Sequence, residues 1–262
     1  MGKLSHLTRR IARRSLPRRL YGSLRVLISP QYFADLDLVT YNQDRLLTQA
    51  NCDFISDERF ARAYSVGEET DSWWGVPIHW RIHVMFWAAT RALGMEGDFV
   101  ECGVNRGGFS RSIMEYVDFK SMPERKYYLL DTFSGLVDDL ISDEERGNGI
   151  RAGAYPDTWE DVQRTFRDFD NVVLIRGIVP ETLPQVKAEK ICYLSLDMNC
   201  AEPEIAAAEH FWDRLVSGAA IVLDDYGFTE FAVQKREFDA FAKRRNVPIL
   251  SLPTGQGLIL KP

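Results

Sequence analysis

The chain has 262 residues, of which 45% are apolar and 27% charged, and its formal net charge is −6. These proportions are typical of a soluble globular protein, and no run approaches the roughly 18 apolar residues that a membrane-spanning helix needs. The four cysteines lack the spacing of metal ligands. We interpret them as small apolar residues in a reducing compartment, and we expect a cytoplasmic protein.

Residues 1–30 form a strongly basic arm. They carry +8 with no acidic residue, which leaves −14 on the rest of the chain. Three interpretations fit: a solvated arm, an amphipathic helix in peripheral contact with an anionic membrane, or an organelle transit peptide. We expect no nucleic-acid partner, because phosphates would repel the acidic remainder of the chain.

Residues 31–96 are expected to form helices that cover the functional site. Residues 57–64 have the pattern of a capped amphipathic helix, and residues 71–75 form an aromatic loop that contains Trp73 and Trp74. Aromatic rings in such a loop either stack on the ring of a bound ligand or anchor the interface of a homo-oligomer. Both interpretations stay open.

Residues 97–108, with the sequence GDFVECGVNRGG, contain an apolar run that ends at Glu101 and a glycine-rich turn that precedes a helical pattern. Because glycine lacks a Cβ, such a turn lets backbone N–H groups approach a charged ligand closely. The pattern indicates the site of a nucleoside cofactor. The alternative is that the glycines serve only to make the turn.

A second predicted strand, residues 126–130, also ends at an acid, Asp131. In doubly wound folds an acid at this place accepts hydrogen bonds from the two ribose hydroxyls of a cofactor. Residues 137–156, a segment rich in acidic side chains, follow this strand. We interpret them as a mobile lid whose negative charge would discourage the binding of acidic substrates. A helix over 158–169 and a strand over 171–175 come next.

Two further predicted strands end in acids: residues 191–196 end at Asp197, and residues 219–223 end at Asp224 and Asp225. In a βαβ unit the strands are parallel neighbours, so the three aspartates should meet at one edge of the sheet. No Lys or Arg lies in the motif, so we expect magnesium, calcium or manganese to offset their repulsion. The alternative is that these acids merely end strands or cap a helix.

The helix between those two strands is predicted over residues 204–215, with Gly218 closing it. Residues 248–252 and 257–261 are predicted to form a C-terminal hairpin. Alternating strands and helices of this kind indicate an α/β fold built on a mostly parallel sheet.

Five motifs of the chain, at residues 80–83, 97–104, 131–136, 180–184 and 224–227, occur in the order found in one family. Over about residues 55–262 the sequence resembles the macrocin O-methyltransferase family. Its members are class I enzymes that use S-adenosylmethionine to methylate sugar hydroxyls with the help of a divalent metal.

This resemblance implies a Rossmann-like class I methyltransferase fold with a mostly parallel seven-stranded sheet, helices on both faces, a C-terminal antiparallel hairpin and an N-terminal helical extension. It divides the chain into the basic arm (1–30), a helical cap (31–96) and an S-adenosylmethionine-binding domain (97–262). We also expect a homo-oligomer and a sugar acceptor that is a glycan or a glycosylated metabolite.

The resemblance also assigns site residues. Mg²⁺ would be held by Asp197, Asp224 and Asp225, and the catalytic candidates are Asp197, Asp225 and His83. The residues implied in S-adenosylmethionine binding are Glu101, Gly103, Val104, Asn105, Gly108, Ser110, Asp131, Thr132 and Phe133.

One departure from the family is Asn199, which stands where related enzymes have an aspartate proposed as the general base. An amide cannot take the proton, so Asp225, a histidine or a metal-bound hydroxide would act instead, or the acceptor is acidic enough to need no base. Two alternatives to a sugar O-methyltransferase follow. One is a relative that binds the cofactor but is catalytically impaired. The other is a nicotinamide-dependent oxidoreductase, which the lack of a Gly-x-Gly-x-x-Gly turn disfavours.

Overall fold

The structure is a computed structural model that describes residues 38–262. The basic arm, with the membrane contact predicted for it, lies outside the described residues. The chain divides into two compact units: residues 38–42 and 46–52 form the described part of one, and residues 43–45 and 53–262 form the other. Within the described residues no helix has the length and apolar character needed to cross a membrane.

The first described residues form a small two-stranded sheet of β1 (Tyr41–Gln43) and β2 (Leu46–Thr48). The two residues that connect the strands, Asp44 and Arg45, have positive φ angles of 50° and 61°. Two such residues in succession are typical of the turns that join tight hairpins. A hairpin therefore replaces the helix expected in this part of residues 31–96.

The second unit is built on a seven-stranded sheet with the order β5-β4-β3-β6-β7-β9-β8. The first five strands of this order pair in parallel, and β9 is antiparallel to both of its neighbours. The strands are β3 (Asp98–Cys102), β4 (Tyr127–Asp131), β5 (Val172–Arg176), β6 (Ile191–Leu196), β7 (Leu215–Leu223), β8 (Leu250–Ser251) and β9 (Gly257–Leu260). This topology confirms the predicted Rossmann-like α/β fold and its C-terminal antiparallel hairpin.

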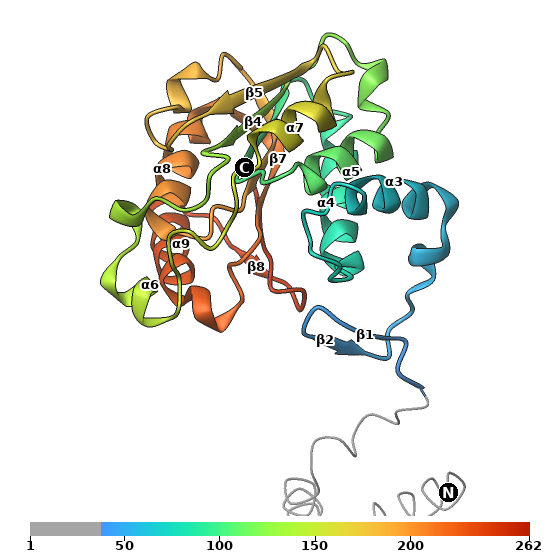
Figure 1. The fold of residues 1–262 in the computed structure, drawn as a ribbon, viewed down its shortest axis with the longest axis horizontal. Helices are drawn as coiled ribbons and strands as arrows, with labels where there is room; N and C mark the ends of the chain where they lie inside the picture. The colour runs from blue at the N-terminus through green and yellow to red at the C-terminus, as the bar shows by residue number, and fades with distance from the viewer. Residues whose placement is uncertain (1–37) are drawn as a thin grey trace, which may run out of the picture. The chain divides into compact units, whose positions relative to one another are not determined.

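Helices cover both faces of this sheet, with α3, α4 and α5 on one side and α8 and α9 on the other (Figure 1). The helices are α3 (Glu58–Glu68), α4 (His79–Ala92), α5 (Gly108–Tyr116), α6 (Asp143–Gly147), α7 (Trp159–Phe166), α8 (Ala201–Phe211) and α9 (Ala232–Arg245). Each face has its own apolar core. Ile82 of α4 and Ile113 of α5 belong to one core, and Ala208 of α8 and Phe241 of α9 belong to the other.

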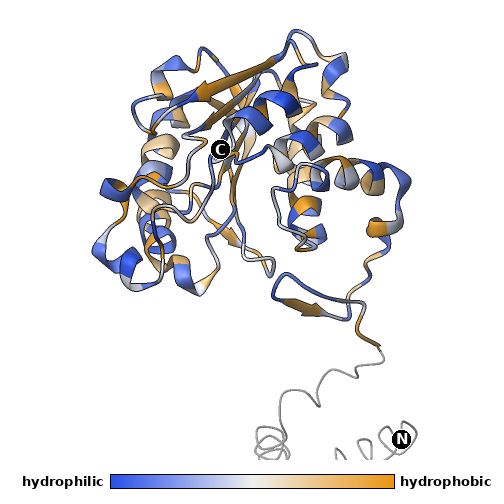
Figure 2. Ribbon diagram, in the orientation of Figure 1, coloured by the Kyte–Doolittle hydropathy of each residue, from blue (hydrophilic) through white to orange (hydrophobic). Residues whose placement is uncertain are grey.

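Successive residues of β3 supply these two cores in turn. On β3, Phe99 packs in the core of α4 and α5, whereas Val100 packs in the core of α8 and α9. All six residues of β6 are buried. Strands covered on both faces have nearly continuous apolar sequences, which Figure 2 shows as hydrophobic arrows between mixed helices.

The helix between β6 and β7 ends earlier than predicted, and β7 begins earlier. The helix α8 ends at Phe211, and β7 already begins at Leu215. Gly218, predicted to end the helix, lies inside β7 with a φ of 85°, in the stretch where the pairing with β6 shifts register. Glycine accommodates this irregularity because it tolerates positive φ without a steric cost.

Candidate active site

A cavity of about 560 Å³ opens in the second unit where the parallel strands end. Its walls come from the segments after β3, β4, β5, β6 and β7 and from residues 72–78 before α4. Residues 137–156, here called the acidic insertion, complete them. Ligands of open α/β sheets bind outside the carboxyl ends of the strands, so this is the expected place for a site. The volume is in the range of small-molecule pockets.

The glycine-rich turn after β3 passes very close to the end of β6. Gly103 has a φ of 89°, and a Cβ there would lie 1.9 Å from the carbonyl oxygen of Asp197. At the start of α5, the backbone N–H of Gly108 donates to Oγ of Ser72 at 2.9 Å. The turn therefore needs glycine, and the aromatic loop supplies the acceptor for an N–H group that the helix leaves unpaired.

Asp131 fixes the conformation of the same turn. Its Oδ2 accepts from the N–H groups of Val104 and Asn105 at 2.7 and 2.8 Å, and its Oδ1 accepts from the N–H of Phe133 at 2.8 Å. A carboxylate has about four acceptor positions, so capacity remains for hydroxyl groups of a ligand in the cavity. The end of β4 thus organises the turn after β3.

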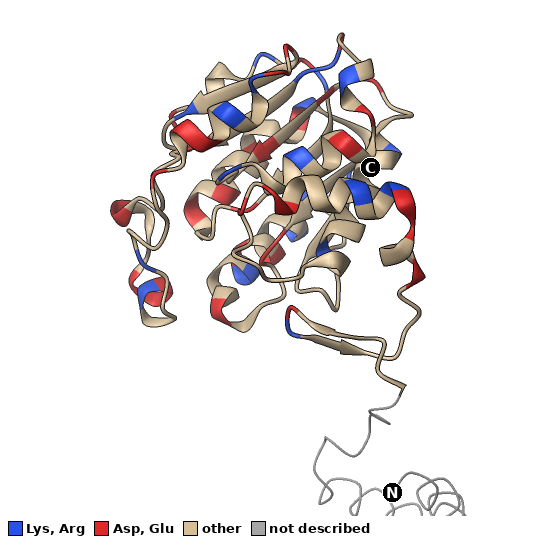
Figure 3. Ribbon diagram, turned by 45° about the vertical axis from the view of Figure 1, so that its right-hand side comes forward, with Lys and Arg blue, Asp and Glu red and all other residues tan. Residues whose placement is uncertain are grey.

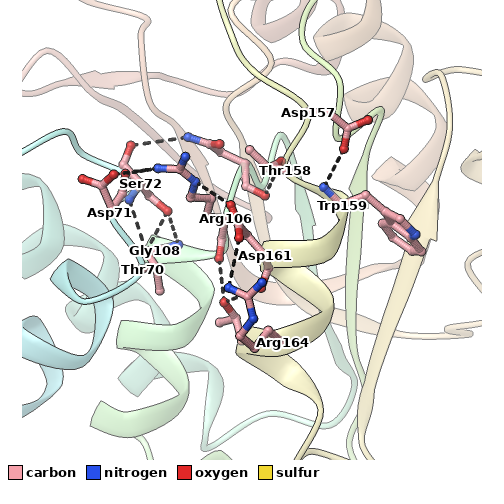
Figure 4. A network of polar contacts seen from close by, with 12 residues as sticks. Thr70, Asp71, Ser72, Arg106, Gly108, Asp157, Thr158, Trp159, Asp161 and Arg164 are labelled. Carbon is pink, nitrogen blue, oxygen red and sulfur yellow. Dashed lines mark hydrogen bonds and ion pairs between the residues drawn. The ribbon is translucent and has the colours of Figure 1, made fainter.

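Further polar contacts join the turn to its neighbours on both sides (Figure 4). Arg106 pairs with Asp71 of the aromatic loop at 2.7 Å and with Asp161 of α7 at 3.1 Å. Oγ1 of Thr158 donates to the carbonyl of Asn105 at 3.2 Å. These contacts hold the turn in a defined shape before any ligand enters, which reduces the ordering cost of binding.

Most residues predicted to bind the cofactor line this cavity: Gly103, Val104, Asn105, Gly108, Asp131, Thr132 and Phe133. Glu101 and Ser110 do not, because both side chains are fully buried beneath it. Glu101 accepts from the hydroxyl of Tyr127 at 2.9 Å, and burial raises the pKa of Glu101 to about 8. The structure therefore places neither side chain in the cavity wall, where it could contact a ligand directly.

The three aspartates predicted from strand ends come together in the cavity. Asp197, Asp224 and Asp225 each present a carboxylate oxygen within 4.8 Å of the others. Burial, with the neighbouring carboxylates second, raises the pKa of Asp197 and of Asp225 well above the usual range. Oδ2 of Asp225 is buried without a hydrogen-bond partner among the described residues. An unpaired buried carboxylate among hard oxygen donors fits a divalent cation such as Mg²⁺.

Arg81 of α4 is a member of this cluster that we did not predict. Its Nη1 donates to Oδ2 of Asp224 at 2.6 Å, and its Nε and Nη2 donate to the two oxygens of Asp44 at 2.8 and 3.1 Å. Gln256 donates to the other oxygen of Asp224 at 3.0 Å. The basic residue that is missing from the strand ends is therefore supplied by α4. The motif at residues 80–83 contained Arg81, but no local pattern connected it to acids so distant in sequence.

His83 does not reach the cavity, contrary to its selection as a catalytic candidate. Its ring stacks on Phe54 with the centroids 4.1 Å apart, and burial lowers the pKa of His83. Two positions along an α-helix correspond to a rotation of roughly 200°. Because Arg81 faces the aspartates, His83 faces the apolar layer of α3 instead.

Asn199 lies in the cavity wall with a φ of 55°, and its Nδ2 lies 3.3 Å from Oδ1 of Asp197, to which it donates. The acidic insertion, residues 137–156, is held nearby by Glu145. Its carboxylate accepts from Ser142, the N-cap of α6, and from the N–H of Ala201 at 2.8 Å. The segment that we interpreted as a mobile lid is therefore anchored at the start of α8.

A sequence model of the macrocin-O-methyltransferase (TylF) family matches residues 85–249, more than half of the chain. The 8-demethyl-8-(2,3-dimethoxy-alpha-L-rhamnosyl)-tetracenomycin-C 4'-O-methyltransferase of Streptomyces olivaceus is 28% identical over 141 residues, which are 51% of this chain and 54% of that protein. The mycinamicin III 3''-O-methyltransferase of Micromonospora griseorubida is 27% identical over 146 residues, 51% of this chain and 56% of that protein. The chain thus spans about half the length of the curated relatives it matches.

Two solved structures share the fold. The O-methyltransferase NovP superposes with a TM-score of 0.58 at 21% identity, covering 69% of this chain and 79% of its own. The calicheamicin methyltransferase CalS11 superposes with a TM-score of 0.54 at 17% identity, covering 86% of this chain and 96% of its own. At these identities the likeness concerns the fold alone.

Proposed function

The chain belongs to the macrocin-O-methyltransferase family, and from this premise we propose that it transfers a methyl group from S-adenosylmethionine to a sugar hydroxyl with the assistance of a divalent cation. The acceptor in this proposal is a glycan or a glycosylated metabolite, because the matched relatives are named for glycosylated substrates.

One observation carries the proposal: the ordered turn after β3 and the three aspartates border the same cavity, and the turn packs against the backbone of Asp197. Gly103 of the turn leaves no room for a Cβ against the carbonyl of Asp197. A cofactor in the turn and a cation on the aspartates would therefore be neighbours. Methyl transfer gains most of its acceleration from holding the two reactants in line at short distance.

The residues that would hold S-adenosylmethionine are those of the turn together with Asp131 and Thr132, which line the cavity. Asp131 would accept from the ribose hydroxyls with the acceptor capacity that its three backbone donors leave free. When bound, the cofactor supplies an electrophilic methyl group on a sulfonium.

Asp197, Asp224 and Asp225 would hold the cation, and Mg²⁺ suits their hard oxygens. When bound, it supplies Lewis acidity that lowers the pKa of the acceptor hydroxyl. Arg81 and Gln256 orient both oxygens of Asp224. Oδ2 of Asp225 is buried and has no hydrogen-bond partner among the described residues, so this carboxylate has acceptor capacity for the cation and for a proton.

We therefore propose Asp225 as the acceptor of the hydroxyl proton. Asn199 cannot accept it, and His83 lies outside the cavity wall. A cofactor-binding relative without turnover is the second candidate, and Asn199 is the observation that favours it. A nicotinamide-dependent oxidoreductase leaves the three aspartates without a role.

Formation of S-adenosylhomocysteine from S-adenosylmethionine, measured with a panel of rhamnosides, tests the proposal. We expect turnover with Mg²⁺, its loss with a chelator, and its return when Mg²⁺ is restored. An enzyme that binds S-adenosylhomocysteine but methylates no member of the panel would instead support the impaired relative. Turnover that persists in the chelator would contradict the role of the cation.

A further inference from the structure

We propose that Trp74 and Tyr155 form an aromatic platform that binds the acceptor and determines its specificity. This inference rests on the proposed function, because it places a sugar ring in the cavity beside the three aspartates. It goes beyond it by naming the side chains that recognise the acceptor and by requiring an uncharged acceptor with an apolar ring face.

The two tryptophans of the aromatic loop have different environments. Trp73 is half-buried and packs against Tyr64 and Phe109, with ring centroids 5.1 and 6.2 Å apart. Both side chains border the cavity, but Trp74 remains 55% exposed. Trp73 therefore serves the core, and Trp74 offers a large apolar surface to whatever occupies the cavity mouth.

The backbone of Trp74 is held in an unfavourable conformation. Its φ is 49°, in the left-handed region, which is sterically unfavourable for a bulky residue. Strained residues of this kind cluster at ligand-binding sites, where the surrounding structure maintains them. An exposed ring gains little from burial in return, so the strain points to a role in binding.

Tyr155 comes from the acidic insertion and completes the platform. Its ring stacks on that of Trp74 with the centroids 5.5 Å apart and the planes at 29°. Gly135 lets the insertion approach, because a Cβ there would lie 3.2 Å from the carbonyl of Tyr155 and its φ is 91°. The platform thus joins two segments that both belong to the cavity wall.

The platform lies next to the aspartates where the reaction would occur. Tyr155 is in the wall together with Asp197 and Asn199. Burial, and after it the charges of Asp197 and Asp225, raise the pKa of Tyr155 above its usual range. The hydroxyl therefore stays protonated and can donate to a sugar oxygen while the rings contact the C–H face.

The charges around the cavity favour an uncharged acceptor. Among the described residues of its wall the only basic side chains are Arg45 and Arg81. Arg45 pairs with Glu230, and Arg81 pairs with Asp44 and Asp224. Acidic and basic residues are also interspersed over the rest of the second unit (Figure 3). A phosphate-bearing acceptor would meet carboxylates and no unpaired cation in this wall.

Binding of methyl α-L-rhamnopyranoside to the protein loaded with S-adenosylhomocysteine and Mg²⁺ tests the inference. We expect Trp74→Ala to weaken the affinity for this probe about tenfold, and Tyr155→Phe to weaken it by a smaller factor. Trp87→Ala is the matched control, since Trp87 is 45% exposed on α4 but lies outside the cavity wall. It should leave the affinity unchanged, and all three variants should bind S-adenosylhomocysteine as the wild type does.

Four results would overturn the inference. One is that the Trp74→Ala variant binds the sugar as tightly as the wild type or as Trp87→Ala. A second is that the wild type binds S-adenosylhomocysteine but not the sugar. A third is that it binds dTDP-L-rhamnose more tightly than the neutral rhamnoside. The last is that Trp74→Ala weakens the binding of S-adenosylhomocysteine instead of the sugar, which would assign the Trp74 ring to the cofactor site. Failure of the wild type to bind S-adenosylhomocysteine at all would contradict the proposed function itself.

Discussion

Arg81 donates from Nη1 to Oδ2 of Asp224 at 2.6 Å, which connects α4 to the end of β7. The two side chains are 17% and 2% exposed, so both charges are largely removed from water. The same guanidinium also holds Asp44 through two hydrogen bonds. A cationic side chain of α4 therefore offsets part of the negative charge of the three aspartates.

Arg81→Met should destabilise the protein by about 3–5 kcal/mol, because it leaves Asp224 and Asp44 as buried, unpaired carboxylates. Arg81→Lys should recover only part of this, since an ammonium cannot reproduce the two-pronged contact with Asp44. Urea unfolding measures both. Arg236→Met is the control, because its pair with Glu144 is more than half exposed and should contribute little to stability. Equal losses in Arg81→Met and Arg236→Met would show that the buried pair is not structural.

Asp225→Asn should weaken Mn²⁺ binding at least about tenfold, because it removes a hard anionic ligand from the cluster. Without metal, the same variant should be no less stable than the wild type, since the substitution removes like-charge repulsion. Mn²⁺ binding followed by electron paramagnetic resonance, together with thermal unfolding with and without Mn²⁺, measures both effects. Asp239→Asn, on the exposed pair with Lys235, should change neither. Unaltered Mn²⁺ affinity in Asp225→Asn would exclude this residue as a ligand.

Glu101→Gln should flatten the dependence of stability on pH. Burial raises the pKa of Glu101 from 4.5 to about 8, so the folded state binds the proton more tightly than the unfolded state does. Its contribution to stability is therefore complete below about pH 4.5 and is lost as the pH rises through about 8. The difference in unfolding free energy between variant and wild type, followed from about pH 5 to pH 9, isolates this group from Asp197 and Asp225. A difference that does not change with pH would contradict the shift.

Gly103→Ala should prevent the turn after β3 from forming its native shape and should abolish binding of S-adenosylhomocysteine. The added Cβ would stand 1.9 Å from the carbonyl oxygen of Asp197, at a φ of 89°. Gly147→Ala is the matched control, because a Cβ at the end of α6 would meet no atom within 4 Å. It should be neutral or stabilising by up to about 1 kcal/mol. Calorimetry and thermal unfolding compare the two, and a Gly103→Ala variant that binds normally would refute the close approach.

The acids at strand ends could be predicted because their position depends only on the topology of the sheet. Once Asp131, Asp197 and Asp224 follow parallel neighbours, they must reach the same edge. The face of the sheet to which the Glu101 side chain points could not be predicted in this way. Every residue from Phe99 to Cys102 is buried, so no alternation of polar and apolar residues marks which face of β3 points to the cavity.

Contacts between segments that are distant in the sequence could not be predicted either. Asp44, Arg81 and Asp224 meet only because the turn between β1 and β2, α4 and β7 converge, and no local pattern encodes that. The choice of His83 over Arg81 had the same origin, since a helix that is apolar around much of its surface does not reveal which side faces the site. The hairpin at residues 41–48 depends on positive φ angles at Asp44 and Arg45, two residues without the glycine that usually signals such a turn.

Titration calorimetry with S-adenosylhomocysteine tests most directly whether the cavity is a methyltransferase cofactor site, and it should compare the wild type with Asp131→Ala. We expect one molecule to bind per chain with or without Mg²⁺. Asp131→Ala should weaken binding at least about tenfold, because it removes the proposed ribose acceptor and releases the N–H groups of Val104 and Asn105. No binding by a folded wild type, or equal binding by the two proteins, would contradict the assignment of this cavity.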